Sequence, residues 1–323
     1  MNKKERVIAA IKGEPACGVP SGFSLHFPAE LTRGDAAVKA HLDFFRATDT
    51  DILKIMNENL VPCYGEIACA ADYARLIPTI SMRTPWMADQ IDLTRRILDA
   101  SDGDAFTLGT LHGTLASCLH PIEKLGIGYE PARDLQLGLL RENERKALDG
   151  MRRIVDGMCE LARAYIEAGV DGVYYAALGG ERRWLTDEEF ARWIEPFDKQ
   201  ILSAIREAGG YAFLHICKDG LNMNRYADYG AYADVVNWGV YEAPLSIEDG
   251  RALFPGKTVF GGLPNRSGVL VNGTDEEIHV AVTELLRKYG PDGFILGADC
   301  TLATEQDLGK VRIAVETARA FRA

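Results

Sequence analysis

A histidine and a cysteine stand two residues apart in the segment Tyr211-Ala-Phe-Leu-His-Ile-Cys-Lys-Asp-Gly220. The segment is apolar as far as a turn at Asp219-Gly220, which predicts a short strand that ends there. Residues two apart in a strand point to the same face, so His215 and Cys217 would present an imidazole and a thiol side by side. Such a pair favours a soft divalent metal, zinc above all.

Two ligands do not make a site, and Cys300 is the best candidate for the third. It ends Gly293-Phe-Ile-Leu-Gly-Ala-Asp-Cys300, another apolar segment that runs into a polar turn. Glu242 follows the strand predicted to lie beside His215 and is the natural fourth ligand, through a carboxylate oxygen. These residues predict a zinc site, provided that the strands carrying them end at the same rim of one barrel.

Eight apolar segments alternate with segments of helical periodicity along the chain. The predicted strands are residues 19–27, 51–56, 105–111, 170–176, 211–216, 234–238, 258–262 and 293–298. This alternation predicts an α/β fold, a (β/α)8 TIM barrel with extra N-terminal helices, in a single domain over residues 1–323. Residues 60–103 depart from a minimal strand–helix repeat, and we interpret them as an insertion over the barrel mouth.

Chemistry in such barrels takes place at the carboxyl ends of the strands. Beyond the metal ligands, that rule selects one catalytic candidate, His112, with Glu242 as a second. It also selects four candidates for substrate binding: His26, Asn57, Arg182 and Trp238. His26 and His112 either orient a substrate or are hydrogen-bonded barrel histidines. Arg182 either holds an anionic group such as a sulfonate or carboxylate, or forms a salt bridge at the surface.

Composition narrows the class of protein. A formal net charge of −11 argues against nucleic acid or an anionic membrane surface as a partner. No apolar run approaches the roughly 20 residues that span a bilayer. The basic start of the sequence leads into an amphipathic helix rather than a signal-peptide core, so we expect a cytoplasmic protein with reduced thiols. A homodimer remains open.

Several motifs resemble the uroporphyrinogen decarboxylase superfamily over nearly the whole chain. They are Arg6-Val-Ile-Ala-Ala-Ile-Lys-Gly-Glu14, Gly109-Thr-Leu-His-Gly-Thr-Leu-Ala116, Leu214-His-Ile-Cys217 and Gly256-Lys-Thr-Val-Phe-Gly-Gly-Leu-Pro264. The His-x-Cys…Cys pattern is similar to the zinc site of the methylcobamide:coenzyme M methyltransferase-like branch and to that of cobalamin-independent methionine synthases. The arginine-rich motif of the true porphyrinogen decarboxylases is replaced by Ser24-Leu-His-Phe-Pro28, so decarboxylation of a porphyrinogen is not expected. Relatives often have Gly where this chain has Lys218.

The resemblance implies a zinc-dependent methyltransferase. Its zinc would activate a small thiol acceptor, and a methylated corrinoid on a separate protein would be the methyl donor, with a folate derivative as another candidate carrier. Two alternatives stay open. One is a metal-independent decarboxylase acting on a non-porphyrin acid, and the other is a non-catalytic protein that binds a corrinoid partner and carries a structural zinc.

Overall fold

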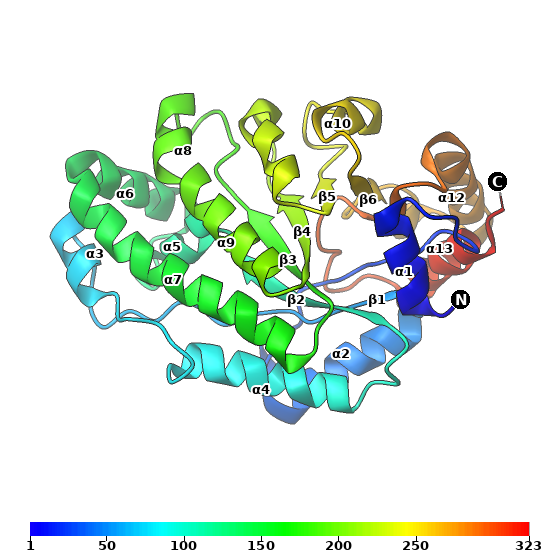
Figure 1. The fold of residues 1–323 in the computed structure, drawn as a ribbon, viewed down its shortest axis with the longest axis horizontal. Helices are drawn as coiled ribbons and strands as arrows, with labels where there is room; N and C mark the ends of the chain where they lie inside the picture. Colours follow the sequence, from blue (N-terminus) through cyan, green and yellow to red (C-terminus); the bar gives the residue numbers. More distant parts are fainter. Residues whose placement is uncertain (323) are drawn as a thin grey trace.

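Seven parallel strands form one sheet in which each strand pairs with the next one along the chain. A computed structural model describes residues 1–322 of the chain. Its strands are β1 (Ile52–Lys54), β2 (Phe106–His112), β3 (Gly172–Ala177), β4 (Tyr211–Ile216), β5 (Val235–Trp238), β6 (Thr258–Leu263) and β7 (Phe294–Ala298). Seven of the eight predicted strands therefore exist, and the sheet curls as in a TIM barrel (Figure 1). The predicted α/β barrel fold is confirmed.

The predicted first strand, residues 19–27, is irregular but takes the place of the eighth. Two isolated parallel bridges, Ser21 with Leu296 and Leu25 with Leu302, join it to β7 and the segment after it. On its other side, the carbonyl oxygen of Ser21 accepts from the amide of Ile52 at the start of β1. The segment thus lies between the first and last strands and closes the barrel.

Local sequence explains why this segment pairs only at single residues. Pro20 has no amide hydrogen to donate to a neighbouring strand. Gly22 allows a close approach, because a Cβ atom there would stand 3.0 Å from side-chain atoms of Ile52 and Phe260. The prediction of a regular strand over residues 19–27 is wrong, while its position in the barrel is right.

Helices surround the sheet (Figure 1). The α-helices are α1 (Lys3–Lys12), α2 (Gly34–Thr48), α3 (Ala70–Leu76), α4 (Pro85–Asp99), α5 (Thr114–Glu123), α6 (Tyr129–Glu142), α7 (Glu144–Ala168), α8 (Asp187–Trp193), α9 (Glu195–Glu207), α10 (Ile247–Leu253), α11 (Val269–Asn272), α12 (Asp275–Tyr289) and α13 (Leu308–Ala320). Two 3-10 helices, η1 (Ala29–Leu31) and η2 (Met223–Ala231), accompany them. Their ends follow local signals: the long α7 begins at the cap Asn143 and ends at Gly169, whose φ of 106° suits glycine.

Part of the predicted insertion belongs to the outer ring of helices. Helix α4 packs between α2 and α7, as a ring helix does, whereas α3 packs on α7 and α6. The hydroxyl of Tyr73 on α3 donates to the carbonyl oxygen of Cys118 on α5, which follows the carboxyl end of β2. Only the first part of residues 60–103 therefore departs from the strand–helix repeat, and it lies on the side where the strands end.

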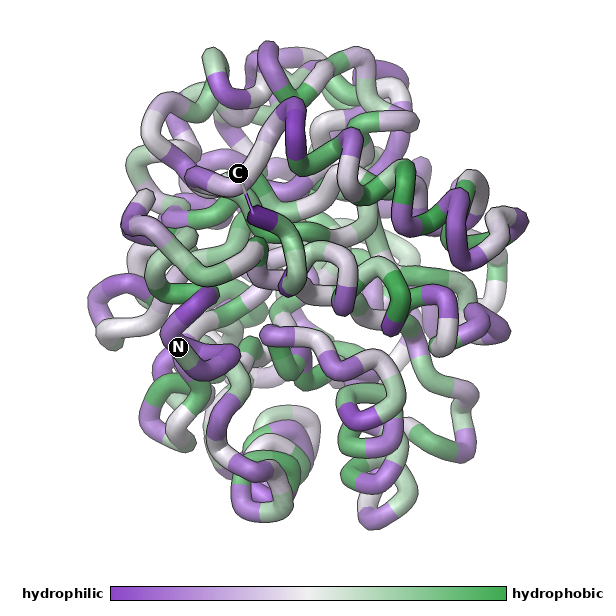
Figure 2. The backbone as a smooth tube through the Cα atoms, turned by 90° about the vertical axis from the view of Figure 1, so that its right-hand side faces the viewer, coloured by the Kyte–Doolittle hydropathy of each residue, from purple (hydrophilic) through white to green (hydrophobic). Residues whose placement is uncertain are grey.

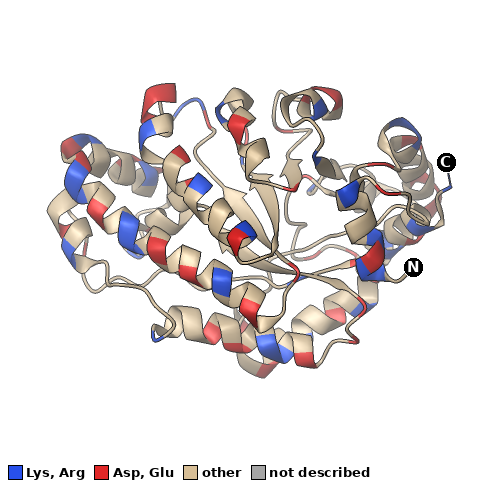
Figure 3. Cartoon of the chain, in the orientation of Figure 1, with Lys and Arg blue, Asp and Glu red and all other residues tan. Residues whose placement is uncertain are grey.

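The barrel interior is apolar near the amino ends of the strands and polar near their carboxyl ends. One buried cluster joins α1 to inward-facing strand residues: Val7, Ala10, Ile52, Phe106, Leu108, Tyr174, Phe213, Val235, Phe260 and Ile295. Figure 2 shows hydrophobic backbone concentrated inside, and Figure 3 places most charged residues on the surrounding helices. Within residues 1–322, no helix is long and apolar enough to cross a membrane.

Candidate metal centre

Three side chains that bind soft metals come together at the carboxyl end of the barrel. One ligand atom from each of His215, Cys217 and Cys300 lies within 4.8 Å of the other two. The two sulfur atoms are 4.0 Å apart, although 83 residues separate them in the sequence. His215 is near the end of β4, Cys217 directly follows that strand, and Cys300 follows β7 by two residues. The three side chains therefore meet at one place, as the sequence analysis predicts.

The buried imidazole of His215 has both ring nitrogens free to bind a ligand. The residue is only 2% exposed, and neither ring nitrogen has a hydrogen-bond partner. Its ring stacks on Tyr174 with a centroid separation of 5.3 Å and an interplanar angle of 23°, which fixes its orientation. Because buried polar atoms nearly always find a partner, an unpaired imidazole beside two sulfur atoms fits a zinc ion.

The two thiols differ in acidity. The pKa of Cys300 is held well below its usual range, because its sulfur accepts a hydrogen bond from Cys217 and lies beside His215. The same contact and burial raise the pKa of Cys217 well above its usual range. The lowered pKa favours the thiolate form of Cys300 even without a metal. The thiolate is the form of cysteine that binds zinc.

A lysine that the sequence analysis did not select lies near the sulfurs of Cys217 and Cys300. The Nζ atom of Lys54 is 3.5 Å from the centre of the Tyr174 ring and 3.2 Å from the Ser24 hydroxyl oxygen. Burial lowers the pKa of Lys54 to about 8, and the nearby sulfurs of Cys300 and Cys217 oppose that effect. A lysine inside the apolar segment 51–56 was the available signal, since apolar strands seldom carry a charge toward a barrel interior.

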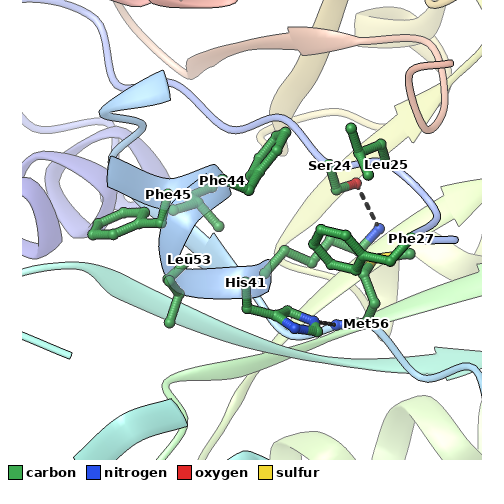
Figure 4. A pocket seen from close by; sticks show the side chains of 10 residues that line it. Ser24, Leu25, Phe27, His41, Phe44, Phe45, Leu53 and Met56 are labelled. Atoms are coloured by element: carbon green, nitrogen blue, oxygen red, sulfur yellow. Dashed lines mark hydrogen bonds between the residues drawn. The ribbon is translucent and has the colours of Figure 1, made fainter. Parts of the chain in front are cut away.

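The wall behind Lys54 is tightly packed. Figure 4 shows the side chains that line this wall: Ser24 and Leu25 come from the closing segment, and His41 and Phe44 come from α2. They surround a cavity of about 10 Å³, room for roughly one water molecule. His41 accepts from the amide of Met56 with Nε2 at 2.9 Å, and its other nitrogen lies 2.7 Å from the Ala37 carbonyl oxygen. This wall supports the strand that carries Lys54.

Two further predicted histidines lie at the same end of the barrel. His26, with 48% of its side chain exposed, has Nδ1 2.8 Å from a carboxylate oxygen of Glu58. The contact with His26 lowers the pKa of Glu58 against the opposing effect of burial. His112 packs edge-on against His120 with ring centroids 5.2 Å apart. Burial lowers the pKa of His112 to about 4, so its ring is neutral at neutral pH.

Glu242 lies outside the set of three ligands. Among residues 1–322, the group of His, Cys, Asp and Glu side chains close enough to share an ion holds only His215, Cys217 and Cys300. Glu242 is exposed on the loop after β5, near Gly239. Asp299 directly precedes Cys300 in the chain. One of its oxygens accepts from the Tyr241 amide at 3.0 Å, the other has no partner, and burial raises its pKa to about 6.

The predicted substrate contacts have different surroundings. Asn57 is buried, with its amide nitrogen 3.4 Å from the Thr110 carbonyl oxygen, whereas Arg182 is exposed in the loop after β3. Trp238 corrects a prediction: its indole donates to the Leu245 carbonyl oxygen at 3.0 Å, and its ring packs on Gly250 of α10, outside the barrel.

Asn237, the neighbour of Trp238 on β5, takes the interior position. It accepts from the Tyr174 hydroxyl at 3.0 Å and donates to the Ala298 carbonyl oxygen at 3.2 Å. Tyr174, whose ring stacks on His215, belongs to β3. Asn237 therefore links β3 to the end of β7, close to Cys300. A polar side chain one residue before the aromatic one was the signal available in the sequence.

Comparison with known families decides the relationship. The family described as Uroporphyrinogen decarboxylase (URO-D) matches residues 56–321. The chain belongs to this family. No curated protein matches the sequence.

Solved structures extend the likeness of this URO-D family member to nearly the full length of the chain. A methyltransferase from Methanosarcina mazei superposes with a TM-score of 0.78 at 15% sequence identity, covering 98% of each chain. B12-independent methionine synthases from Shewanella sp. W3-18-1, in complex with selenomethionine, and, as a putative one, from Listeria monocytogenes both give a TM-score of 0.55. Their identities are 11% and 14%, and both comparisons cover 94% of this chain and 97% of the other. At such identities the likeness establishes the fold.

Proposed function

We propose that this protein is a zinc-dependent methyltransferase that moves a methyl group between a corrinoid or folate carrier and a thiol acceptor. His215, Cys217 and Cys300 would hold the zinc. The observation that carries the proposal is the meeting of these three side chains at the catalytic end of a barrel, with both nitrogens of His215 unpaired. A donor set of three protein ligands suits a catalytic zinc, because structural sites are closed by four.

Zinc bound there supplies a Lewis acid that lowers the pKa of a thiol, so that the thiolate is available at neutral pH. The protein supplies the rest. Tyr174 fixes the imidazole plane of His215 by stacking. Lys54, near the two sulfurs, offsets the negative charge that collects when several sulfurs are ionised.

Other residues at the mouth would handle the acceptor and its proton. The His26–Glu58 pair is partly exposed and can pass a proton from the arriving thiol to solvent. His112 is neutral at neutral pH, so we assign it an orienting role in catalysis rather than that of a proton donor. Glu242 remains a proposed fourth ligand, which its loop would have to bring inward. The methyl donor is proposed to be a methylcorrinoid carried by a partner protein.

Methyl transfer and metal content test the proposal together. The purified chain is incubated with methylcobalamin and a panel of thiols, and demethylation is followed in the corrin spectrum. We expect about one zinc per chain and thiol-dependent demethylation, both lost in Cys217→Ser and Cys300→Ser. Cys17→Ser, at an exposed cysteine, is the matched control and should change neither.

Other outcomes would select the alternatives. Release of carbon dioxide from a carboxylic acid by a metal-free chain, without methylation of any thiol, would establish a decarboxylase. Tightly bound zinc whose coordination never responds to added thiols would favour a structural metal. Glu242→Gln decides the fourth ligand, since unchanged zinc affinity would leave the site with three.

A further inference from the structure

A second group of polar side chains, which includes the residue that follows Cys217, contains four buried donor atoms without hydrogen-bond partners. It comprises Tyr129, Arg133, Glu181, Trp184 and Lys218, and we call it the Arg133 cluster. Arg133 on α6 is fully buried, yet its Nε and Nη1 atoms have no hydrogen-bond partner. The indole nitrogen of Trp184 and the hydroxyl of Tyr129 are also buried without partners. All of these atoms can donate hydrogen bonds.

The rings and the cations of the cluster are close together. The Arg133 guanidinium carbon lies 5.8 Å from the ring centres of both Tyr129 and Trp184. The Nζ atom of Lys218 is 4.6 Å from the centre of the Tyr129 ring. Lys218 is exposed, and Tyr129 and Trp184 are half-buried, so the cluster runs from the surface to the buried guanidinium.

The Arg133 cluster and the proposed metal ligands are neighbours in the sequence at Cys217 and Lys218. Lys218 directly follows Cys217, and its φ of 86° is one that residues other than glycine seldom adopt. The antiparallel bridge between Glu181 and Leu221 joins the loop after β3 to the loop after β4. This local structure places the lysine next to the metal ligand Cys217.

Glu181 satisfies only a part of Arg133. One of its oxygens accepts from the Nη2 atom of Arg133 at 3.2 Å, and the other accepts from the Gly179 amide at 2.9 Å. Glu123, half-buried on α5, lies near enough to Lys218 and Arg133 for both to lower its pKa against the larger effect of burial. Neither carboxylate pairs with the free Nε and Nη1 atoms, and a buried guanidinium with unpaired donors is costly to the fold.

We propose that the Arg133 cluster is a subsite for an anionic group of the substrate, a carboxylate or a sulfonate. The identification of that substrate as a thiol rests on the proposed function. Arg133, Tyr129 and Trp184 donate to the anion's oxygens, and Lys218 attracts it at the entrance. Rotation of one of the two half-buried rings admits the anion, whose thiol end then points toward Cys217.

Binding of thiol-free anions tests the subsite apart from catalysis. Propionate and propane-1-sulfonate are titrated into the full chain, with 1-propanol as the neutral control. We expect both anions, and not the alcohol, to change tryptophan emission, and we expect Trp184→Phe to abolish that change. The tighter of the two anions identifies the preferred group. An equal response to 1-propanol would overturn the proposal.

Calorimetry on variants assigns the contacts. Tyr129→Phe removes one donor, and Arg133→Met combined with Glu181→Met removes the guanidinium without leaving an unpaired buried carboxylate. Each should weaken anion binding about tenfold or more. Lys218→Gly should weaken it about threefold, and Glu123→Gln should tighten it. Arg152→Met, at an exposed arginine of α7, is the control and should have no effect. Wild-type anion affinity in the double variant would refute the subsite.

A kinetic comparison separates this proposal from the proposed function. With methylcobalamin as donor, 3-mercaptopropionate should have a lower KM than 3-mercapto-1-propanol, and Lys218→Gly should raise the KM for the acid with kcat unchanged. If the two thiols react equally well, the subsite is wrong and the methyltransferase stands. If the anions bind but neither thiol is methylated, the subsite stands and the methyltransferase is wrong.

Discussion

Replacing Asp198 by asparagine should change how the stability of this protein depends on pH. Asp198 on α9 is fully buried and accepts hydrogen bonds from the hydroxyls of Tyr175 and Tyr229. The Tyr175 hydroxyl also accepts from the Thr114 amide at the start of α5, so the cluster supports the rim of the barrel. Burial is the largest influence on Asp198 and raises its pKa from 3.8 to about 6.

The direction follows from where the proton is held. Between pH 4 and pH 6 the folded protein keeps the proton on Asp198 while the unfolded chain releases it, so this group makes the fold less stable as pH rises. Over that interval the difference between the two pKa values corresponds to about 3 kcal/mol. Asparagine carries no charge, and Asp198→Asn should remove this loss.

Urea unfolding of both proteins at pH 4.0 and pH 7.5 measures the effect. Relative to wild type, Asp198→Asn should gain about 3 kcal/mol in free energy of unfolding on going from the lower to the higher pH. Asp89→Asn, at an exposed carboxylate of α4, is the control and should show no such gain. If the difference between Asp198→Asn and wild type is the same at both pH values, our account of this buried carboxyl is refuted.

Three further predictions concern the metal centre and its supports. Cys300→Ser should lower zinc content by at least tenfold with little change in the circular dichroism spectrum, and full zinc retention would contradict its role as a ligand. Lys54→Met should raise, by roughly one unit, the pH midpoint for alkylation of the thiols in zinc-free protein, because a nearby positive charge is lost; an unchanged midpoint would show that Lys54 does not act on the sulfurs. Trp238→Phe should cost about 1 kcal/mol in unfolding free energy through its hydrogen bond to Leu245, with turnover unaffected. A large loss of turnover would restore Trp238 as a substrate contact.

The meeting of His215, Cys217 and Cys300 could be predicted because it follows from simple periodicities. His215 and Cys217 share a face because they are two apart at the end of an extended segment. Cys300 joins them because strands of one barrel end at the same rim, and the structure brings the two sulfurs to 4.0 Å. Neither inference requires knowledge of side-chain packing.

The failures lie where packing decides. Trp238 and Asn237 are adjacent on a strand of four residues, too short for its alternation to show which one faces inward. Residues 19–27 have the apolar character of a strand, but Pro20 has no amide hydrogen to donate and the segment pairs with its neighbours only at single bridges. Arg133 lies in an amphipathic helix, and its contacts with Glu181 and Trp184 come from a segment that follows much later in the chain. Its unpaired donors appear only in the structure.

X-ray absorption at the zinc edge of the purified protein tests the central claim most directly. The account predicts about one zinc per chain, with two sulfur ligands near 2.3 Å and one imidazole nitrogen near 2.0 Å. In Cys300→Ser the zinc signal per chain should fall by at least tenfold, as the loss of a ligand predicts. A chain that binds no zinc, or a zinc surrounded only by nitrogen and oxygen, would contradict the account.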